Sequence, residues 1–195
     1  MTRRGRAGAK AELGDRAGGS LRDVPTLVLD PQPAWVERLL EERRRSGAAR
    51  RDEVWEGVLH VIPPPSVEHE RLAHALHVLL DPHAAAVNLV VVGTVGIGTE
   101  ENYRVPDLAV LRPRYAPQWH RTAALIVEIV SPHDDTWEKL PFYARHQVDE
   151  VMIVVPAEQG IHWLGLEADW EYSPLEQSRL LGVTTTELAA QLIWP

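Results

Sequence analysis

The 195-residue sequence contains no cysteine and no apolar run as long as a transmembrane helix. The lack of cysteine excludes disulfide bonds and thiolate metal sites, and it fits a reducing cytoplasm. A membrane span needs about 18 consecutive apolar residues, so we expect no membrane partner. The opening residues, MTRRGRAGAK, have basic side chains without the apolar segment of a secretory signal. We therefore expect a cytoplasmic protein.

Lysine is almost absent. Of the 20 basic residues, only Lys10 and Lys139 are lysine, and the other 18 are arginine. The net charge is −8 and the pI is near 5.6, which does not favour a protein that coats nucleic acid through a broad basic face. An enzyme with a local basic groove, or one whose bound cations supply positive charge, remains compatible with these values.

The length and the 45% hydrophobic content suit one folded domain. Residues 1–24 are rich in glycine, alanine and arginine without periodicity, and we expect a disordered basic tail there. Residues 25–195 are expected to form the single domain.

The hydrophobic pattern of this domain predicts an α/β fold. We expect a helix between Pro33 and Gly47, a hairpin in DEVWEGVLHVI with its turn at Glu56 and Gly57, and a helix capped by Ser66. Strands follow after Pro82, then a helix over 135–146, strands in EVMIVV, GIHWLGL and WEYS, and a short helix from Thr186. This order predicts a mixed β-sheet flanked by helices.

Two acidic residues interrupt apolar strands. Glu128 lies inside LIVEIV, a run so apolar that we expect both faces of its strand to be covered, and Asp107 opens the strand PDLAVL directly after Pro106. Neighbouring strands would bring these carboxylates together, where they repel unless a cation lies between them. A hard divalent ion such as Mg²⁺ prefers oxygen ligands of this kind. Lys139, 11 positions after Glu128, could reach the same point, and such a group would form a phosphodiester hydrolysis site.

The segments VPDLAVLRP and LIVEIVSPHDDTWEKLPFYARHQVDEVMIVVP resemble the signature of the Uma-type restriction endonucleases, within the PD-(D/E)XK nuclease superfamily. The resemblance extends upstream to DEVWEGVLHVIPPPSVEHERL. It implies a restriction-endonuclease-like fold, Mg²⁺ or Mn²⁺, and Asp107, Glu128 and Lys139 as the catalytic set. In the superfamily motif the lysine follows the acid by two positions, where this chain has Val130. The Uma-type pattern places its lysine in the following helix, which matches Lys139.

We therefore expect a Mg²⁺-dependent endonuclease that hydrolyses phosphodiester bonds in nucleic acid, with DNA as the substrate. Asp107, Glu128 and the backbone carbonyl of Ile129 would hold the metal, while Glu53 and His69 would support the site. A homodimer is expected, because a symmetric pair of sites suits two strands. Specificity would come from loops such as 112–121.

Other interpretations of the same residues stay open. Asp107 could be a turn residue, Glu128 could pair with an arginine, and Lys139 could pair with Asp135 at i,i+4. The chain could then be a catalytically inactive nuclease-fold module for binding or assembly. A paired-carboxylate glycoside hydrolase would need no metal and gives Lys139 no role. Trp137 is a candidate for stacking on a base.

Overall fold

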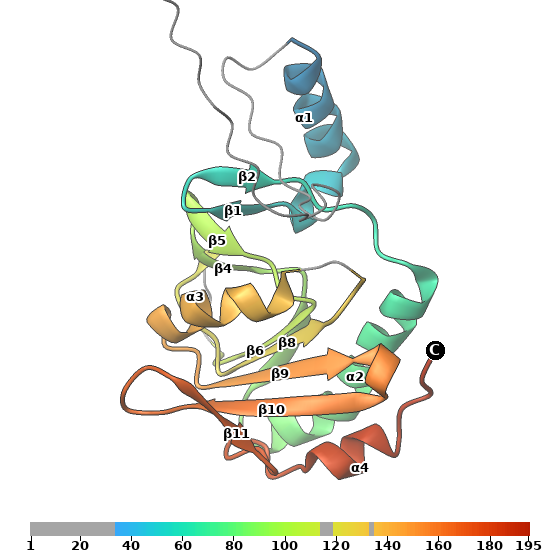
Figure 1. Ribbon diagram of the computed structural model, residues 1–195, viewed down its shortest axis with the longest axis vertical. Coiled ribbons are helices and arrows are strands. Elements are labelled where there is room, and N and C mark those ends of the chain that lie inside the picture. The colour runs from blue at the N-terminus through green and yellow to red at the C-terminus, as the bar shows by residue number, and fades with distance from the viewer. Residues whose placement is uncertain (1–33, 114–118, 133–134) are drawn as a thin grey trace, which may run out of the picture.

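The computed structural model describes residues 34–113, 119–132 and 135–195, and its strands form two sheets (Figure 1). The predicted disordered tail, residues 1–24, lies outside the described residues, so its disorder and the boundary at residue 25 stay predictions. The predicted mixed α/β architecture with flanking helices is confirmed. Its strands divide between two sheets where the pattern indicated one.

The five-stranded sheet has the order β2-β1-β5-β4-β7, with only β4 and β7 parallel among its neighbours. Its strands are β1 (Glu53–Trp55), β2 (Val58–His60), β4 (Gly96–Thr99), β5 (Asn102–Arg104) and β7 (Trp119–His120). The predicted hairpin is confirmed as β1 and β2, with Glu56 and Gly57 both at positive φ, as a tight hairpin turn requires.

The six-stranded sheet has the order β11-β10-β9-β8-β6-β3, with β8 and β9 parallel at its centre. Its strands are β3 (Val90–Gly93), β6 (Leu108–Leu111), β8 (Leu125–Ile129), β9 (Glu150–Val155), β10 (Gly160–Leu166) and β11 (Tyr172–Leu175). All five residues of β8 are buried, which confirms the central position predicted from LIVEIV.

The helical elements are α1 (Ala34–Ser46), α2 (Val67–Ala86), α3 (Leu140–Arg145) and α4 (Thr185–Ala189), with the 3₁₀ turns η1 (Ala48–Arg51), η2 (Thr136–Lys139) and η3 (Pro156–Glu158). One core lies between the six-stranded sheet and the helices α2 and α4, and a second lies on the α3 side. No helix in the described ranges is both long enough and apolar enough to cross a membrane.

Side chains of β8 alternate between these two cores. Leu125, Val127 and Ile129 pack in the α2 core, whereas Ile126 packs on the α3 side. Since successive residues of a strand point to opposite faces, Glu128 shares the α3 face with Ile126. The alternation therefore directs the one acid of this strand toward η2 and α3.

Two helices differ in part from the prediction. The helix predicted over roughly 135–146 is confirmed in extent, but its first turn is the 3₁₀ helix η2, and the α-helix α3 begins only at Leu140. Pro141 explains the change, because it has no N–H to bond backward and so cannot continue an α-helix that begins earlier. The helix α2 does begin after its Ser66 cap, but it continues past Pro82 to Ala86.

Candidate active site

The register of β6 and β8 places the two predicted carboxylates opposite one another. Leu108 pairs with Val127 in this antiparallel ladder, so one step further along Asp107 faces Glu128. The backbone N–H of Ile129 donates to Asp107 Oδ2 at 2.8 Å. The two acids, 21 positions apart in sequence, therefore lie at adjacent strand ends, as predicted.

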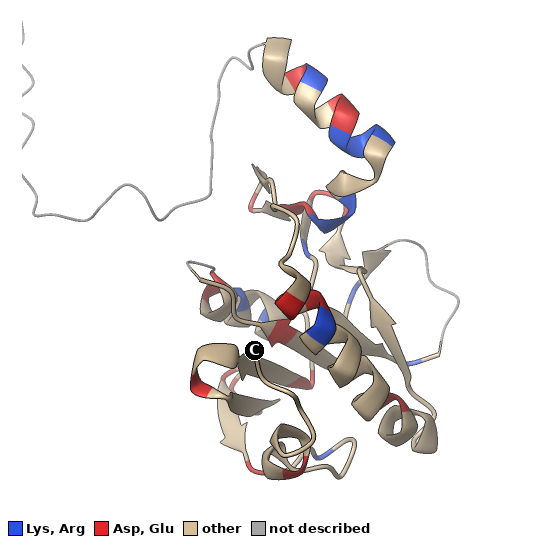
Figure 2. Ribbon diagram, turned by 90° about the vertical axis from the view of Figure 1, so that its right-hand side faces the viewer, with Lys and Arg blue, Asp and Glu red and all other residues tan. Residues whose placement is uncertain are grey.

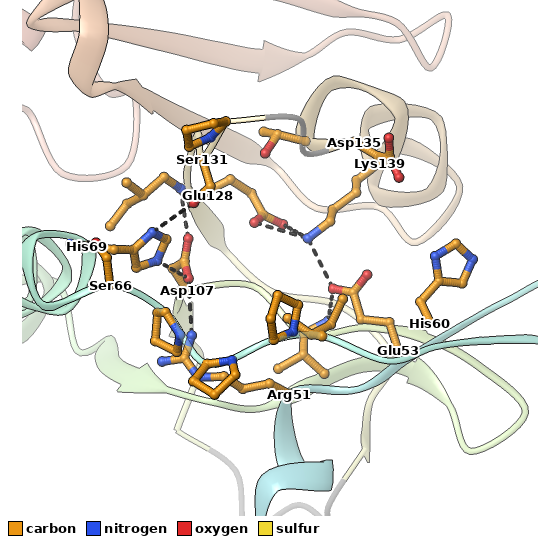
Figure 3. Close-up of a pocket in the computed structure, with 18 of the residues that line it drawn as sticks. Arg51, Glu53, His60, Ser66, His69, Asp107, Glu128, Ser131, Asp135 and Lys139 are labelled. Atoms are coloured by element: carbon orange, nitrogen blue, oxygen red, sulfur yellow. Dashed lines mark hydrogen bonds and ion pairs between the residues drawn. The ribbon is translucent and has the colours of Figure 1, made fainter. Parts of the chain in front are cut away.

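The six residues predicted to catalyse the reaction, hold the metal or support the site line one cavity of about 530 Å³ (Figure 3). It opens between the two sheets and receives side chains from β1, the start of α2, the strand ends and η2. The predicted residues that it brings together are Glu53, His69, Asp107, Glu128, Ile129 and Lys139.

Lys139 reaches the carboxylates although it stands outside the usual superfamily position. Its Nζ lies 3.0 Å from Glu53 Oε1 and 3.1 and 3.2 Å from the two oxygens of Glu128. Burial by itself lowers the pKa of Lys139, but the charges of Glu128 and Glu53 outweigh it and raise the pKa above its usual value. The side chain is therefore an ammonium at neutral pH. It contacts Glu53 of the five-stranded sheet and Glu128 of the six-stranded sheet.

Glu128 is a buried acid in a strongly negative setting. Burial, together with the charges of Asp107 and Glu53, raises the pKa of Glu128 to about 7 against the lowering effect of Lys139. Tyr143, one turn after Lys139, donates its hydroxyl hydrogen to Glu128 Oε1 and favours the ionised form. Lys139 therefore offsets part of the negative charge around Glu128.

Asp107 is held from the opposite side by α2. His69 Nε2 lies 2.8 Å from Asp107 Oδ1, and His69 Nδ1 lies 3.2 Å from Ser131 Oγ. The hydrogen bond to Asp107 raises the pKa of His69 against the effect of burial. Arg51 adds positive charge, with a guanidinium nitrogen 3.6 Å from Asp107 Oδ1. These contacts fix the direction in which Asp107 presents its oxygens.

Glu53 is fully enclosed by donors at the cavity wall. Its carboxylate accepts from Val105 N at 2.8 Å and from Trp55 Nε1 at 2.6 Å, in addition to Lys139. Arg104 lies 4.1 Å from the ring centroids of both Trp55 and Phe142, and so connects this hairpin to α3. Glu53 therefore helps to orient Lys139, and its supporting role in catalysis stays a prediction.

The donor set fits a hard divalent cation. The N–H and C=O of one residue in an extended strand point to the same side, so the Ile129 carbonyl is directed with its N–H toward Asp107. Within the described residues, no three acidic or histidine side chains converge as a metal site. Mg²⁺ needs fewer, because it binds through one or two carboxylates and fills its other positions with water and phosphate.

Comparison with known proteins agrees with this geometry. The Uma2 family, described as "Putative restriction endonuclease", matches residues 37–193. This chain belongs to the Uma2 family. A solved structure described as a putative nuclease belonging to DUF820, from Anabaena variabilis ATCC 29413, has a TM-score of 0.61 at 14% identity and covers 73% of this chain and 91% of its own. No curated protein matches.

At 14% identity the Anabaena protein shows the shared fold alone. Membership of the Uma2 family confirms the resemblance found in the sequence and supports a nuclease function. The catalytic and metal-binding roles of individual residues in this Uma2-family chain stay predictions that the cavity geometry makes specific.

Some contacts of the Uma2-family site were not predicted, and one candidate lies elsewhere. Arg51, Ser131 and Tyr143 contact the predicted site residues but were not predicted, although Ser131 and Tyr143 lie within the segment that resembles the Uma-type signature. Trp137 is half exposed and meets His162 edge-on at 5.5 Å, outside the residues that line the cavity. Of the loop 112–121 proposed for specificity, residues 114–118 lie outside the described residues.

The raised pKa of Glu128 predicts a pH-dependent stability. Between its usual value of 4.5 and about 7, the folded chain binds more protons at this carboxyl than the unfolded chain. The free energy of unfolding should therefore fall as the pH rises through that window. Glu128→Gln removes the titration and should reduce this fall by on the order of 3 kcal/mol. Urea unfolding at pH 5 and pH 7.5, in EDTA, measures the difference.

An exposed acid supplies the control for this experiment. Glu176→Gln changes a carboxylate at the surface, so the pH dependence of the wild type should be retained. An unchanged fall in Glu128→Gln would show that the carboxyl of Glu128 titrates normally in the folded chain.

Proposed function

We propose that this Uma2-family chain is a Mg²⁺- or Mn²⁺-dependent endonuclease that hydrolyses phosphodiester bonds in DNA. The observation that carries the proposal is the convergence of Asp107, Glu128 and Lys139 in one cavity, from two strand ends and a 3₁₀ turn. The family description and the shared nuclease fold support the same reaction class.

Asp107, Glu128 and the carbonyl of Ile129 would hold the metal ion. A bound ion of this kind supplies charge neutralisation at the scissile phosphate and acidifies water at neutral pH. Asp107 is kept in place by Ile129 and His69, which leaves its remaining lone pairs directed into the cavity. Glu128 is kept in place by Lys139 and Tyr143.

Lys139 acts as a fixed positive charge. Its raised pKa prevents it from accepting a proton near neutral pH, so it does not serve as the general base. Its ammonium instead stabilises the negative charge that develops on phosphate oxygens and orients the attacking water. A lysine suits this position because a compact charge fits between two buried carboxylates.

The rival interpretations fit the contacts less well. A glycoside hydrolase gives no role to Lys139, whose ammonium lies between Glu53 and Glu128. An inactive binding module gives no reason for Asp107 and Glu128 to share one cavity with Lys139. A homodimer, with one site for each DNA strand, remains part of the proposal.

Metal dependence is the direct test of this function. The purified chain should nick or linearise supercoiled plasmid with Mg²⁺ or Mn²⁺, EDTA should reduce the rate at least about 100-fold, and excess Mg²⁺ should restore it. Agarose gels follow the conversion. Cleavage that persists in EDTA would contradict the metal site, and metal and DNA binding without cleavage would support the inactive module.

A further inference from the structure

Charge is unevenly distributed along the chain. Residues 34–51 contain six arginines and three glutamates, whereas residues 52–195 contain eight basic and 21 acidic residues. A polyanionic substrate is repelled by so acidic a body unless a local surface attracts it. Figure 2 shows basic residues gathered at the end of α1 and in the turn that follows. This segment therefore contains the densest positive charge of the described chain.

The arginines of this segment have different tasks. Arg43 is an anchor, because it bonds to Asp52 at 3.1 Å and to the Ile62 carbonyl at 2.9 Å. Within the described part of the chain, Arg44 pairs only with Glu41, at 3.2 Å, and both side chains are well exposed, so the pair is weak. Among the described residues, Arg45 and Arg50 form no ion pair. Three arginines are thus available to an external anion.

A turn at Gly47 gathers these three side chains. Gly47 has a φ of 80°, which ends α1 and reverses the chain into η1. The Nε of Arg50 lies 4.0 Å from the point that a Cβ on Gly47 would occupy, so the guanidinium folds back over the turn. The result is an open hollow of about 550 Å³, here called the arginine hollow, lined by Arg44, Arg45, Ser46, Gly47, Ala49 and Arg50.

The helix dipole explains this cluster only in part. Cations in the last turn of a helix are stabilised by its partial negative charge, which accounts for Arg44 and Arg45. Arg50 lies beyond α1, in the last turn of the short 3₁₀ helix η1, where the partial charge of one turn is small. Its neighbour Arg51 lines the catalytic cavity, 3.6 Å from Asp107 Oδ1. Consecutive residues of η1 therefore connect the arginine hollow to the candidate catalytic centre.

We propose that the arginine hollow binds the phosphate backbone of the nucleic acid next to the scissile bond. The inference rests on the proposed nuclease function, since it extends the substrate path out of the same cavity. Guanidinium groups bind phosphate oxygens in pairs and carry no sequence preference in such contacts. The hollow would supply affinity and register, while chemistry stays at Asp107 and Glu128.

Salt-dependent DNA binding tests the hollow independently of cleavage. Fluorescence anisotropy with a 30-bp duplex, in EDTA, should show that Arg45→Gln/Arg50→Gln binds at least about tenfold more weakly at 0.1 M salt. The slope of log affinity against log salt should fall by about 1 to 2, since each lost phosphate contact removes ~0.9. The control, Arg145→Gln/Arg179→Gln, removes the same charge from surface pairs with Glu56 and Glu167.

Equal binding by the two double variants would overturn the proposal. Binding to vesicles of anionic phospholipid is measured in parallel. If Arg45→Gln/Arg50→Gln lost affinity for the vesicles and not for the duplex, the proposal would be overturned and the hollow would be assigned to a membrane surface. A short chromogenic phosphodiester is too small to reach from the catalytic cavity to the arginine hollow. It therefore distinguishes the proposed nuclease function from the proposed role of the hollow. Its hydrolysis should be unchanged in Arg45→Gln/Arg50→Gln. If the wild type hydrolyses neither substrate but the duplex result holds, the nuclease function fails while the hollow stands.

Discussion

Asp107→Asn is expected to lower the rate of DNA cleavage at least about a thousandfold without unfolding the chain. The loss follows from removing one of the two anionic groups that would hold the metal, in a buried site where electrostatic contributions are large. Asparagine has nearly the same shape and keeps a carbonyl oxygen that can accept from Ile129 N, as Asp107 Oδ2 does now. Charge is therefore the main property that changes.

Three measurements isolate this effect. The rate of plasmid cleavage should fall, the calorimetric binding of Mn²⁺ should weaken by at least about tenfold, and the melting temperature should change little. Asp149→Asn is the matched control, because it removes the same charge from an exposed ion pair with Arg112. Cleavage within tenfold of the wild type in Asp107→Asn would remove this residue from the catalytic set.

The pairing of Asp107 with Glu128 could be predicted because local pattern determines it. A strand as apolar as LIVEIV must be covered on both faces, and the structure places it at the centre of the six-stranded sheet. The next apolar run upstream, PDLAVL, is then expected to form the neighbouring strand, and it does so as β6. The hydrophobic effect acts on these segments regardless of what the distant parts of the chain do, so the sequence alone was informative.

The division into two sheets could not be predicted in the same way. Strand β5 reads NYR within a polar stretch, and it becomes a strand because Tyr103 pairs with Val54 and Arg104 with Ile97. These are tertiary contacts between segments about 50 positions apart, or across a turn, and no periodicity encodes them. The same holds for Arg51 and Ser131, whose place in the site depends on how α2 packs.

The helical segment after β8 carries a functional consequence. Lys139 ends the 3₁₀ turn η2, and α3 follows directly from Leu140. Tyr143 on α3 then reaches the same carboxylate as Lys139. Two consecutive short elements, η2 and α3, thus direct one side chain each to Glu128.

Lys139 joins the two sheets electrostatically, because it bridges Glu53 of β1 and Glu128 of β8. Lys139→Met is therefore expected to lose both cleavage and stability. Methionine fills a similar volume but leaves two buried carboxylates without their cation, and breaking such a buried pair costs about 3–5 kcal/mol. Urea unfolding should show this loss, and plasmid cleavage should fall at least about a hundredfold. The control Arg145→Met removes an exposed cation and should cost less than about 1 kcal/mol.

A triple variant distinguishes the structural role of this lysine from its catalytic role. Adding Glu53→Gln and Glu128→Gln to Lys139→Met neutralises the uncompensated carboxylates, so most of the lost stability should return. Cleavage should not return, because the ammonium and a metal-binding carboxylate are both missing. If the triple variant remained as unstable as Lys139→Met, the penalty would come from packing. If Lys139→Met itself cleaved DNA within tenfold of the wild type, the ammonium would have no part in the reaction.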